Sequence, residues 1–154
     1  MNKIVSINSK ISLLQKTDFN NALKIECASY SFPWTKKILL SNYGKSYYNL
    51  KLEYNGILIA FLITQVILNE AILLNIVVES SKRRKGLGRK LLRTLIDELN
   101  NKNIITLWLE VRYSNNVAIA LYESLGFNKV SVRYNYYPTK NGREHAHIMA
   151  LTLV

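Results

Sequence analysis

The chain has 154 residues, close to the commonest size of a single domain, so we expect one domain over residues 1–154. Hydrophobic residues make up 49% and charged residues 20%, a composition that excludes wholesale disorder, collagen-like repeats and a disulfide scaffold. The net charge is +11, but the basic residues are scattered except for one cluster between Lys82 and Arg93, so we expect no direct nucleic-acid role.

The sequence predicts a cytoplasmic protein with no membrane partner. The longest apolar run, Ile57 to Ile63, has seven residues, whereas a bilayer span needs about 20. Residues 1–10 alternate polar and apolar types and lack the apolar block of a signal peptide. The single cysteine, Cys27, cannot form a disulfide within the chain, which is typical of a reducing compartment.

The first half of the chain predicts a strand, two helices and an antiparallel meander. Thr17 and Asp18 offer a cap for the first helix, and Cys27 falls on its apolar face, so we expect this thiol in the core. Asn55-Gly56 is a strong hairpin signal between two β-rich runs. The predicted elements are a strand over 4–14, a helix over 18–30, a helix over 35–40 capped by Thr35, and strands over 47–54, 57–68 and 71–78.

The second half alternates strands and amphipathic helices. A leucine-rich stripe within residues 88–100 indicates a helix that covers a sheet, and Gly126 ends a second helix. A meander followed by a strand–helix–strand crossover predicts an α/β fold with a mixed sheet and helices on both faces. The predicted elements are a helix over 88–100, a strand over 104–111, a helix over 115–125, and strands over 128–137 and 145–154.

A glycine-rich basic loop is the most specific chemical signal. Residues 83–88 read Arg83-Arg84-Lys85-Gly86-Leu87-Gly88 and are followed by Arg89, between a buried strand and a helix start. Glycines allow a ligand to approach the backbone, the helix start offers free N–H groups, and the cations favour phosphate oxygens. A dinucleotide fingerprint would need a glycine where Leu91 stands, and no Walker sequence occurs. We therefore expect a phosphate cradle rather than an ordinary solvated glycine turn.

This loop is one of several segments that occur together in a recognisable order. The segments are Asn75-Ile76-Val77-Val78, Arg83-x-x-Gly86-x-Gly88, Leu107-Trp108-Leu109-Glu110-Val111-Arg112, Asn115, and the run from Ala118 to Phe127. Taken together they resemble the GNAT superfamily of acetyl-CoA-dependent N-acetyltransferases. Phe32-Pro33-Trp34 and Asn135-Tyr136-Tyr137-Pro138 are similar to the branch that acetylates the N-terminal alanine of the eighteenth protein of the small ribosomal subunit.

The resemblance implies a fold and a co-substrate. The expected fold is the GNAT fold, a mostly antiparallel sheet of about seven strands with helices on both faces and a V-shaped splay between the fourth and fifth strands. The co-substrate is acetyl-CoA, and no metal is expected. One departure is that Glu79 is followed by Ser80 where the family often has proline, which leaves the loop entry less preset.

The resemblance also implies roles for particular residues. Glu110 would be the general base and Tyr122 the general acid. Without the resemblance, Glu110 would be interpreted as a surface carboxylate and Tyr122 as a tyrosine that packs in the core. A lone carboxylate at the end of an apolar strand is expected to have a raised pKa. The coenzyme would be bound by the backbone of Ile76, Val77 and Val78, by Arg83, Arg84, Lys85, Gly86, Leu87, Gly88 and Arg89, and by Asn115. The predicted walls of the acceptor groove are Trp34, Tyr134, Tyr136 and Tyr137.

The expected function is acetylation of a protein N-terminus, with a ribosomal protein as partner and the enzyme acting as a monomer. Deprotonating an α-amine at pH 7 costs about 1 kcal/mol, against roughly 4.6 for lysine, so a single modest base suffices. Two alternatives stay open: acetylation of a lysine side chain or small amine, and a basic RNA-binding module. His145 and His147 share one strand face without a further ligand type, so they predict no zinc site.

Overall fold

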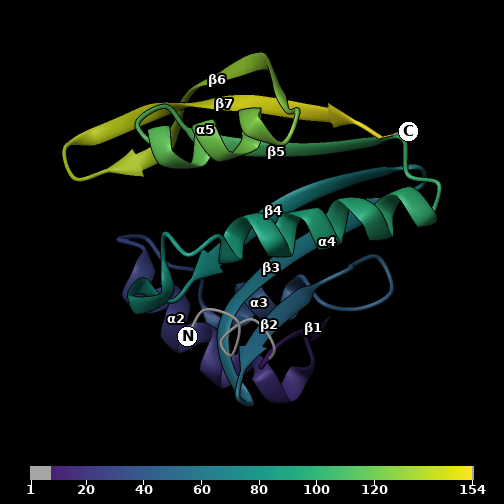
Figure 1. Cartoon of the computed structure of the whole chain (residues 1–154). Coiled ribbons are helices and arrows are strands. Elements are labelled where there is room, and N and C mark those ends of the chain that lie inside the picture. The colour runs from purple at the N-terminus through teal and green to yellow at the C-terminus, as the bar shows by residue number, and fades with distance from the viewer. Residues whose placement is uncertain (1–7, 154) are drawn as a thin grey trace.

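One mixed β-sheet with helices on both faces forms the frame of the molecule (Figure 1). The computed structural model describes residues 8–153. Its elements are β1 (Ser9–Leu13), the 3-10 turn η1 (Lys16–Asp18), α2 (Phe19–Ser29), α3 (Lys36–Ser41), β2 (Leu50–Tyr54), β3 (Ile57–Ile67), β4 (Glu70–Val78), the 3-10 turn η2 (Ser80–Lys82), α4 (Leu87–Asn101), β5 (Thr106–Arg112), α5 (Asn116–Ser124), β6 (Asn128–Thr139) and β7 (Gly142–Thr152).

The strand order is β1-β2-β3-β4-β5-β7-β6, and among the strands of residues 8–153 only β4 and β5 run parallel. These two strands pair over Glu70–Leu73 and Thr106–Leu109 and then separate. A register shift between β3 and β4 leaves Leu74 without a partner on β3, and such a bulge bends a strand and increases its twist. The sheet therefore opens into a V between the second halves of β4 and β5, which confirms the predicted fold.

The sheet separates two hydrophobic cores. On one face α4 buries Leu91, Leu92, Leu95 and Leu99 completely, in a cluster that also contains Ile119 and Tyr122 of α5. On the other face α2 and α3 bury Phe19, Ala22, Ile25 and Leu39 against β3 and β4. The V between β4 and β5 consequently leads from the α4 side of the sheet to the α2 side.

The structure confirms the sequence signals for the tight turn, the helix cap and the helix end. Asn55 and Gly56 have φ of 53° and 78°, as the tight turn between β2 and β3 requires. The Thr35 side chain accepts a hydrogen bond from the N–H of Ile38 at 3.2 Å and begins α3. Gly126, with φ of 101°, follows the end of α5.

Two predictions about α2 are wrong. Asp18 does not cap the helix with its side chain, because its carboxylate binds the Lys51 ammonium at 2.8 Å and the N–H of Gln15 at 2.8 Å. Cys27 is exposed, whereas Glu26 is buried. The buried stripe of α2 contains Ile25 and Glu26, so the thiol of the next residue falls outside it.

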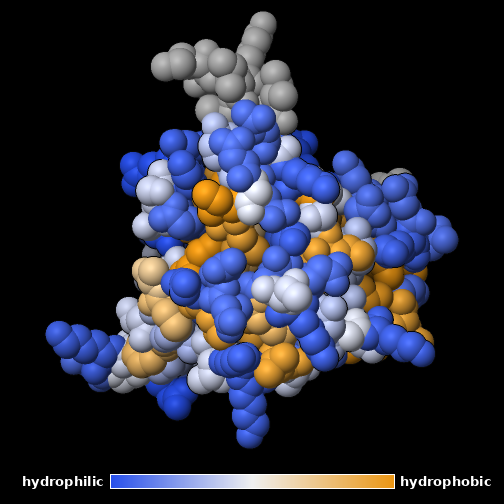
Figure 2. All heavy atoms as spheres, turned by 90° about the horizontal axis from the view of Figure 1, so that it is seen from below, coloured by the Kyte–Doolittle hydropathy of each residue, from blue (hydrophilic) through white to orange (hydrophobic). Residues whose placement is uncertain are grey.

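Element boundaries differ modestly from those expected. The strand predicted from residue 47 begins at Leu50, and Tyr47 instead makes an isolated bridge with Gln65. The strand predicted over 4–14 is β1, and its residues 4–7 lie outside the described residues, as does Val154. None of the helices between residues 8 and 153 is long and apolar enough to cross a membrane. Figure 2 shows hydrophilic side chains over most of one face, with smaller apolar areas between them.

Candidate active site

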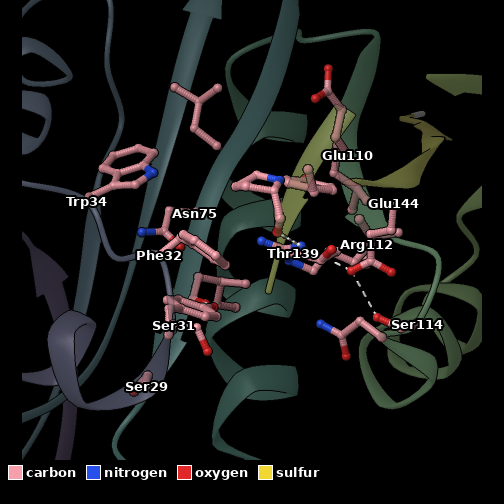
Figure 3. A pocket seen from close by; sticks show the side chains of 18 of the residues that line it. Ser29, Ser31, Phe32, Trp34, Asn75, Glu110, Arg112, Ser114, Thr139 and Glu144 are labelled. Atoms are coloured by element: carbon pink, nitrogen blue, oxygen red, sulfur yellow. Dashed lines mark hydrogen bonds and ion pairs between the residues drawn. The ribbon is translucent and has the colours of Figure 1, made fainter. Parts of the chain in front are cut away.

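A cavity of about 760 Å³ occupies the opening between β4 and β5. Its walls come from α2, the α2–α3 loop, the second halves of β4 and β5, α5 and the residues just before it, and the β6–β7 hairpin. Figure 3 shows Trp34, Phe32 and Asn75 on one side of it, and Glu110, Arg112 and Glu144 on the other. The cavity thus lies where the splay exposes strand edges.

The edge of β4 presents backbone groups to this opening. The Ile76 carbonyl accepts a hydrogen bond from the Tyr30 hydroxyl at 2.6 Å, and the Val78 carbonyl accepts one from Nε of Arg83 at 3.0 Å. Both residues therefore direct their peptide groups away from β3, as alternate residues of a strand do. The Val77 side chain is buried in the core on the α2 side, and Val77 alternates with Ile76 and Val78, so its N–H and C=O groups face β3. An extended ligand can add to this edge as a further strand.

Glu110 lies on the cavity wall near the end of β5, and it has a cationic neighbour that the sequence did not predict. Its Oε1 is 3.2 Å from Nη1 of Arg133 on β6, with side chains 30% and 49% exposed. Burial and the neighbouring Glu110 carboxylate raise the pKa of Tyr136. Because an ion pair this exposed is weak, an arriving ammonium can replace the guanidinium beside Glu110.

Tyr122 projects from α5 to the same cavity and is only 6% exposed. No group between residues 8 and 153 makes a hydrogen bond to its hydroxyl. Burial, reinforced by the nearby Tyr30 and Tyr137 hydroxyls, raises the pKa of Tyr122 well above its usual range. The hydroxyl therefore keeps its proton at neutral pH and is available to donate it.

The basic loop stands outside this cavity, at the start of α4. Arg84 and Gly86 have φ of 61° and 76°, so the chain turns sharply before the helix. Within the described chain, the backbone N–H groups from Arg84 to Arg89 have no acceptor, which leaves a row of donors at a positive helix end. Such a row fits the oxygens of a diphosphate.

Hydrogen bonds hold the loop entry, where Ser80 stands at the position at which the family often has proline. The Glu79 N–H donates to the Ile59 carbonyl at 2.8 Å, and the Glu79 carboxylate accepts from the N–H of Ser81 at 3.3 Å. These contacts join the loop to β3 and begin η2. These hydrogen bonds fix the path of the chain into the loop.

The other predicted residues divide into two groups. Asn115, Trp34 and Tyr137 line the cavity, and the Asn115 Oδ1 also caps α5 through the N–H of Ala118 at 3.2 Å. Tyr134 and Tyr136 do not line it and are 74% and 41% exposed. Since β6 is an edge strand, these two rings remain on the surface.

One part of the cavity wall combines the Arg112 guanidinium with two aromatic rings. The Arg112 guanidinium lies 5.9 Å from the ring centre of Phe32 and 4.5 Å from that of Tyr137. It also pairs with Glu144 at 3.0 Å, and Ser114 donates to the same carboxylate oxygen. Arg112 therefore connects the α2–α3 loop with the β6–β7 hairpin.

Glu26 is a site residue that the sequence analysis did not assign. It is 2% exposed and lines the cavity, with Oε1 accepting from Nδ2 of Asn75 at 2.7 Å and Oε2 accepting from the backbone N–H of Trp34 at 2.8 Å. The signal in the sequence for a buried Glu26 was its place between isoleucine and cysteine in an amphipathic helix. A charged residue on an apolar stripe is rarely buried unless another group pairs with it.

The two histidines have other contacts. The His147 ring stacks on Tyr113 with centroids 3.9 Å apart, and Nδ1 of His145 accepts from the N–H of Asn135 at 2.9 Å. Among the described residues, no group of three or more His, Cys, Asp or Glu side chains could hold a metal ion.

Known proteins are similar to this chain over most of its length. The family model described as Acetyltransferase (GNAT) family matches residues 11–127. The chain is 55% identical over 143 residues to the alanine N-acetyltransferase of ribosomal protein bS18 from Escherichia coli (strain K12), covering 93% of this chain and 97% of that protein. The crystal structure of the Escherichia coli ribosomal-protein-S18-alanine N-acetyltransferase has a TM-score of 0.92 and 54% identity, covering 94% of each chain. The yncA protein of Salmonella typhimurium, solved with its cofactor acetyl-CoA, shares the fold at 21% identity with a TM-score of 0.80, covering 96% of this chain and 95% of that one.

Proposed function

The chain belongs to the GNAT family of acetyltransferases, and from that premise we propose that it transfers the acetyl group of acetyl-CoA to the N-terminal alanine of ribosomal protein bS18. The observation that carries this proposal is the similarity over nearly the full length of both chains to an enzyme of that activity. The proposal includes a cytoplasmic place of action, a single acetyltransferase domain and a monomeric enzyme.

Acetyl-CoA fits the two features that flank the V. The free N–H groups from Arg84 to Arg89 would hold its diphosphate, and the exposed peptide groups of Ile76 and Val78 would pair with its amide-containing arm. Asn115 would reach the arm through its side-chain amide from the start of α5. Acetyl-CoA then supplies an activated thioester carbonyl at the opening of the sheet.

The acceptor would enter from the α2 side, opposite to α4. Trp34 and Tyr137 line the cavity there, on the α2–α3 loop and on β6. An N-terminal residue placed between them brings its amine to the wall that carries Glu110 and Tyr122. Proximity of amine and thioester in one enclosed space contributes much of the rate by itself.

Proton transfers complete the reaction. Glu110 takes one proton from the α-ammonium, and the nitrogen lone pair that is released forms the new bond to the acetyl carbon. The carbon–sulfur bond breaks, and the thiolate receives the Tyr122 proton. The nitrogen then loses its second proton to the Tyr122 oxygen, which restores the hydroxyl and leaves a neutral amide. Burial raises the pKa of Tyr122, which makes its hydroxyl a weaker acid. The same enclosed site also disfavours the charged thiolate and so raises the pKa of the departing thiol. Burial therefore does not by itself prevent the proton transfer.

Intact-mass analysis tests the acceptor. Purified bS18, incubated with this chain and acetyl-CoA, is expected to gain one acetyl group on its N-terminal residue. The control is the same protein with its N-terminus already blocked and all its lysines free, which should gain none. Acetyl groups on internal lysines, or none on either protein, would contradict the proposal and favour a lysine or small-amine acceptor.

Gly86→Val tests the phosphate cradle. Gly86 has φ of 76° with open space around it, so a β-branched residue there strains the turn that presents the N–H row. We expect the KM for acetyl-CoA to rise at least about tenfold, with the KM for peptide nearly unchanged. The matched control is Gly56→Val, because Gly56 has φ of 78° with open space in the β2–β3 turn. Equal effects of the two substitutions on acetyl-CoA would argue against a cradle at Gly86.

A further inference from the structure

Glu26 differs from the other carboxylates of the cavity in having no cationic partner. Glu110 pairs with Arg133 and Glu144 pairs with Arg112, whereas among residues 8–153 no ammonium or guanidinium lies within ion-pair distance of Glu26. Glu26 is also the most deeply buried of the three, at 2% exposure. A buried carboxylate is costly unless a positive charge accompanies it.

The hydrogen bonds of Glu26 leave acceptor positions on its carboxylate unfilled. Asn75 Nδ2 donates to one oxygen and the Trp34 N–H donates to the other, so both oxygens act as acceptors. A carboxylate has about four acceptor positions, of which two are filled here. The anion therefore retains capacity for an N–H donor that reaches it from the cavity.

Glu26 lies on the side of the sheet from which the acceptor would arrive. Its partner Asn75 belongs to β4, next to Ile76 at the open edge, and Trp34 belongs to the predicted acceptor groove. The negative charge acts at this edge, because burial and Glu26 together raise the pKa of Tyr30, whose hydroxyl binds Ile76, to about 12.

A second polar group on the same wall is unused. Ser29 follows Glu26 by three positions, so the two side chains share one face of α2. Ser29 lines the cavity, and its buried Oγ has no hydrogen-bond partner in the described part of the chain. This wall thus offers both an uncompensated anion and an unsatisfied hydroxyl to a polar ligand.

We propose that Glu26 receives the positively charged α-ammonium of the acceptor and holds it at the opening of the sheet until Glu110 takes its proton. This inference rests on the proposed function. The ammonium has three N–H groups, so it donates to Glu26 while another proton faces Glu110. A neutral, blocked N-terminus brings no cation to Glu26 and is rejected, which makes this glutamate a specificity-determining residue for free N-termini.

The test compares binding of two peptides to the enzyme saturated with CoA, where no transfer can occur. One peptide begins with alanine, and the other is its desamino analogue, which has hydrogen in place of the amine. At about pH 6.5 the α-amine, with a pKa near 7.8, is protonated. Calorimetry on the unmodified enzyme should show about ten- to a hundredfold tighter binding of the alanyl peptide, the value of a charge-assisted hydrogen bond. Equal binding of the two peptides would overturn the proposal without any variant.

Variants then assign the preference to Glu26. In Glu26→Gln the two peptides should bind nearly equally, and the KM for peptide should rise more than kcat falls. Asn75→Ala removes the contact between α2 and β4 but keeps the charge, so it should retain the preference, as should Glu110→Gln. If Asn75→Ala abolishes the preference as fully as Glu26→Gln does, Glu26 acts only as a structural link and the proposal is wrong. If the unmodified enzyme acetylates the alanyl peptide but Glu26→Gln still binds it more tightly than the desamino analogue, only the assignment to Glu26 fails. If the unmodified enzyme acetylates no α-amine, the proposed function fails.

Discussion

Glu110→Gln is expected to lower kcat for acetylation of an alanyl peptide by about a hundredfold or more, the usual contribution of a positioned general base. The substitution keeps the size and the hydrogen-bonding shape of the side chain but removes the group that accepts a proton. Arg133 loses its ionic partner, which costs little because that pair is largely exposed. Binding of acetyl-CoA should be nearly unchanged, since Glu110 acts on the acceptor.

The pH dependence of the variant provides a second readout. Without an internal base, only amines that are already neutral can react, so the rate should rise with pH through the amine pKa of about 7.8. The deficit relative to the unmodified enzyme should therefore be largest at low pH. The matched control is Glu70→Gln, because Glu70 contacts Trp108 at the closed end of the β4–β5 pair, away from the cavity. A Glu110→Gln enzyme with normal rates from pH 6 to 9 would remove Glu110 from the base role.

Tyr122→Phe is expected to reduce turnover by about a hundredfold while the protein stays folded. The change removes one oxygen and keeps the ring, which packs 5.7 Å from Phe127 between centroids. No hydrogen bond to the hydroxyl is lost within the described residues, so the melting temperature should change little. Because burial raises the pKa of Tyr122, no loss of activity from its ionisation is expected below about pH 10.

Single-turnover acetylation of an alanyl peptide measures this effect. A thioester with a better leaving group should recover part of the lost rate in Tyr122→Phe, because it needs the proton less. Affinity for acetyl-CoA should change by less than about 1 kcal/mol, since the lost contact matters chiefly when sulfur carries charge. Tyr134→Phe is the control, because Tyr134 is exposed and does not line the cavity. Full activity of folded Tyr122→Phe would show that this tyrosine only packs.

Local signals accounted for the features whose causes are local. The left-handed turn at Asn55-Gly56, the cap at Thr35 and the donor row after Gly86 depend on a few neighbouring residues. The leucine stripe of α4 was predictable for the same reason, because a helix places residues three and four apart on one face. The resemblance carried by such segments also pointed to Glu110 and Tyr122, which the structure places on one cavity.

Burial within α2 was decided by tertiary packing. The apolar face predicted from the sequence contained Cys27, but packing against β3 and β4 buries Ile25 and Glu26 and leaves the thiol in solvent. Helical periodicity gives the width of a stripe but only approximately its phase. The phase is decided when the helix meets its sheet, and here it brings Glu26 to Asn75, which is 49 positions away in sequence.

The sequence by itself thus determined the class of fold, the candidate phosphate-binding loop and the pair of candidate acid–base residues, because each depends on short-range pattern or on ordered motifs. Only the tertiary structure decided which side chains share the cavity. It joined Arg133 to Glu110, moved Tyr134 and Tyr136 to the surface, and placed Glu26, which has no ion-pair partner among residues 8–153, on the cavity wall. These contacts connect elements far apart along the chain, and they form only after the strands have paired and the helices have packed on them.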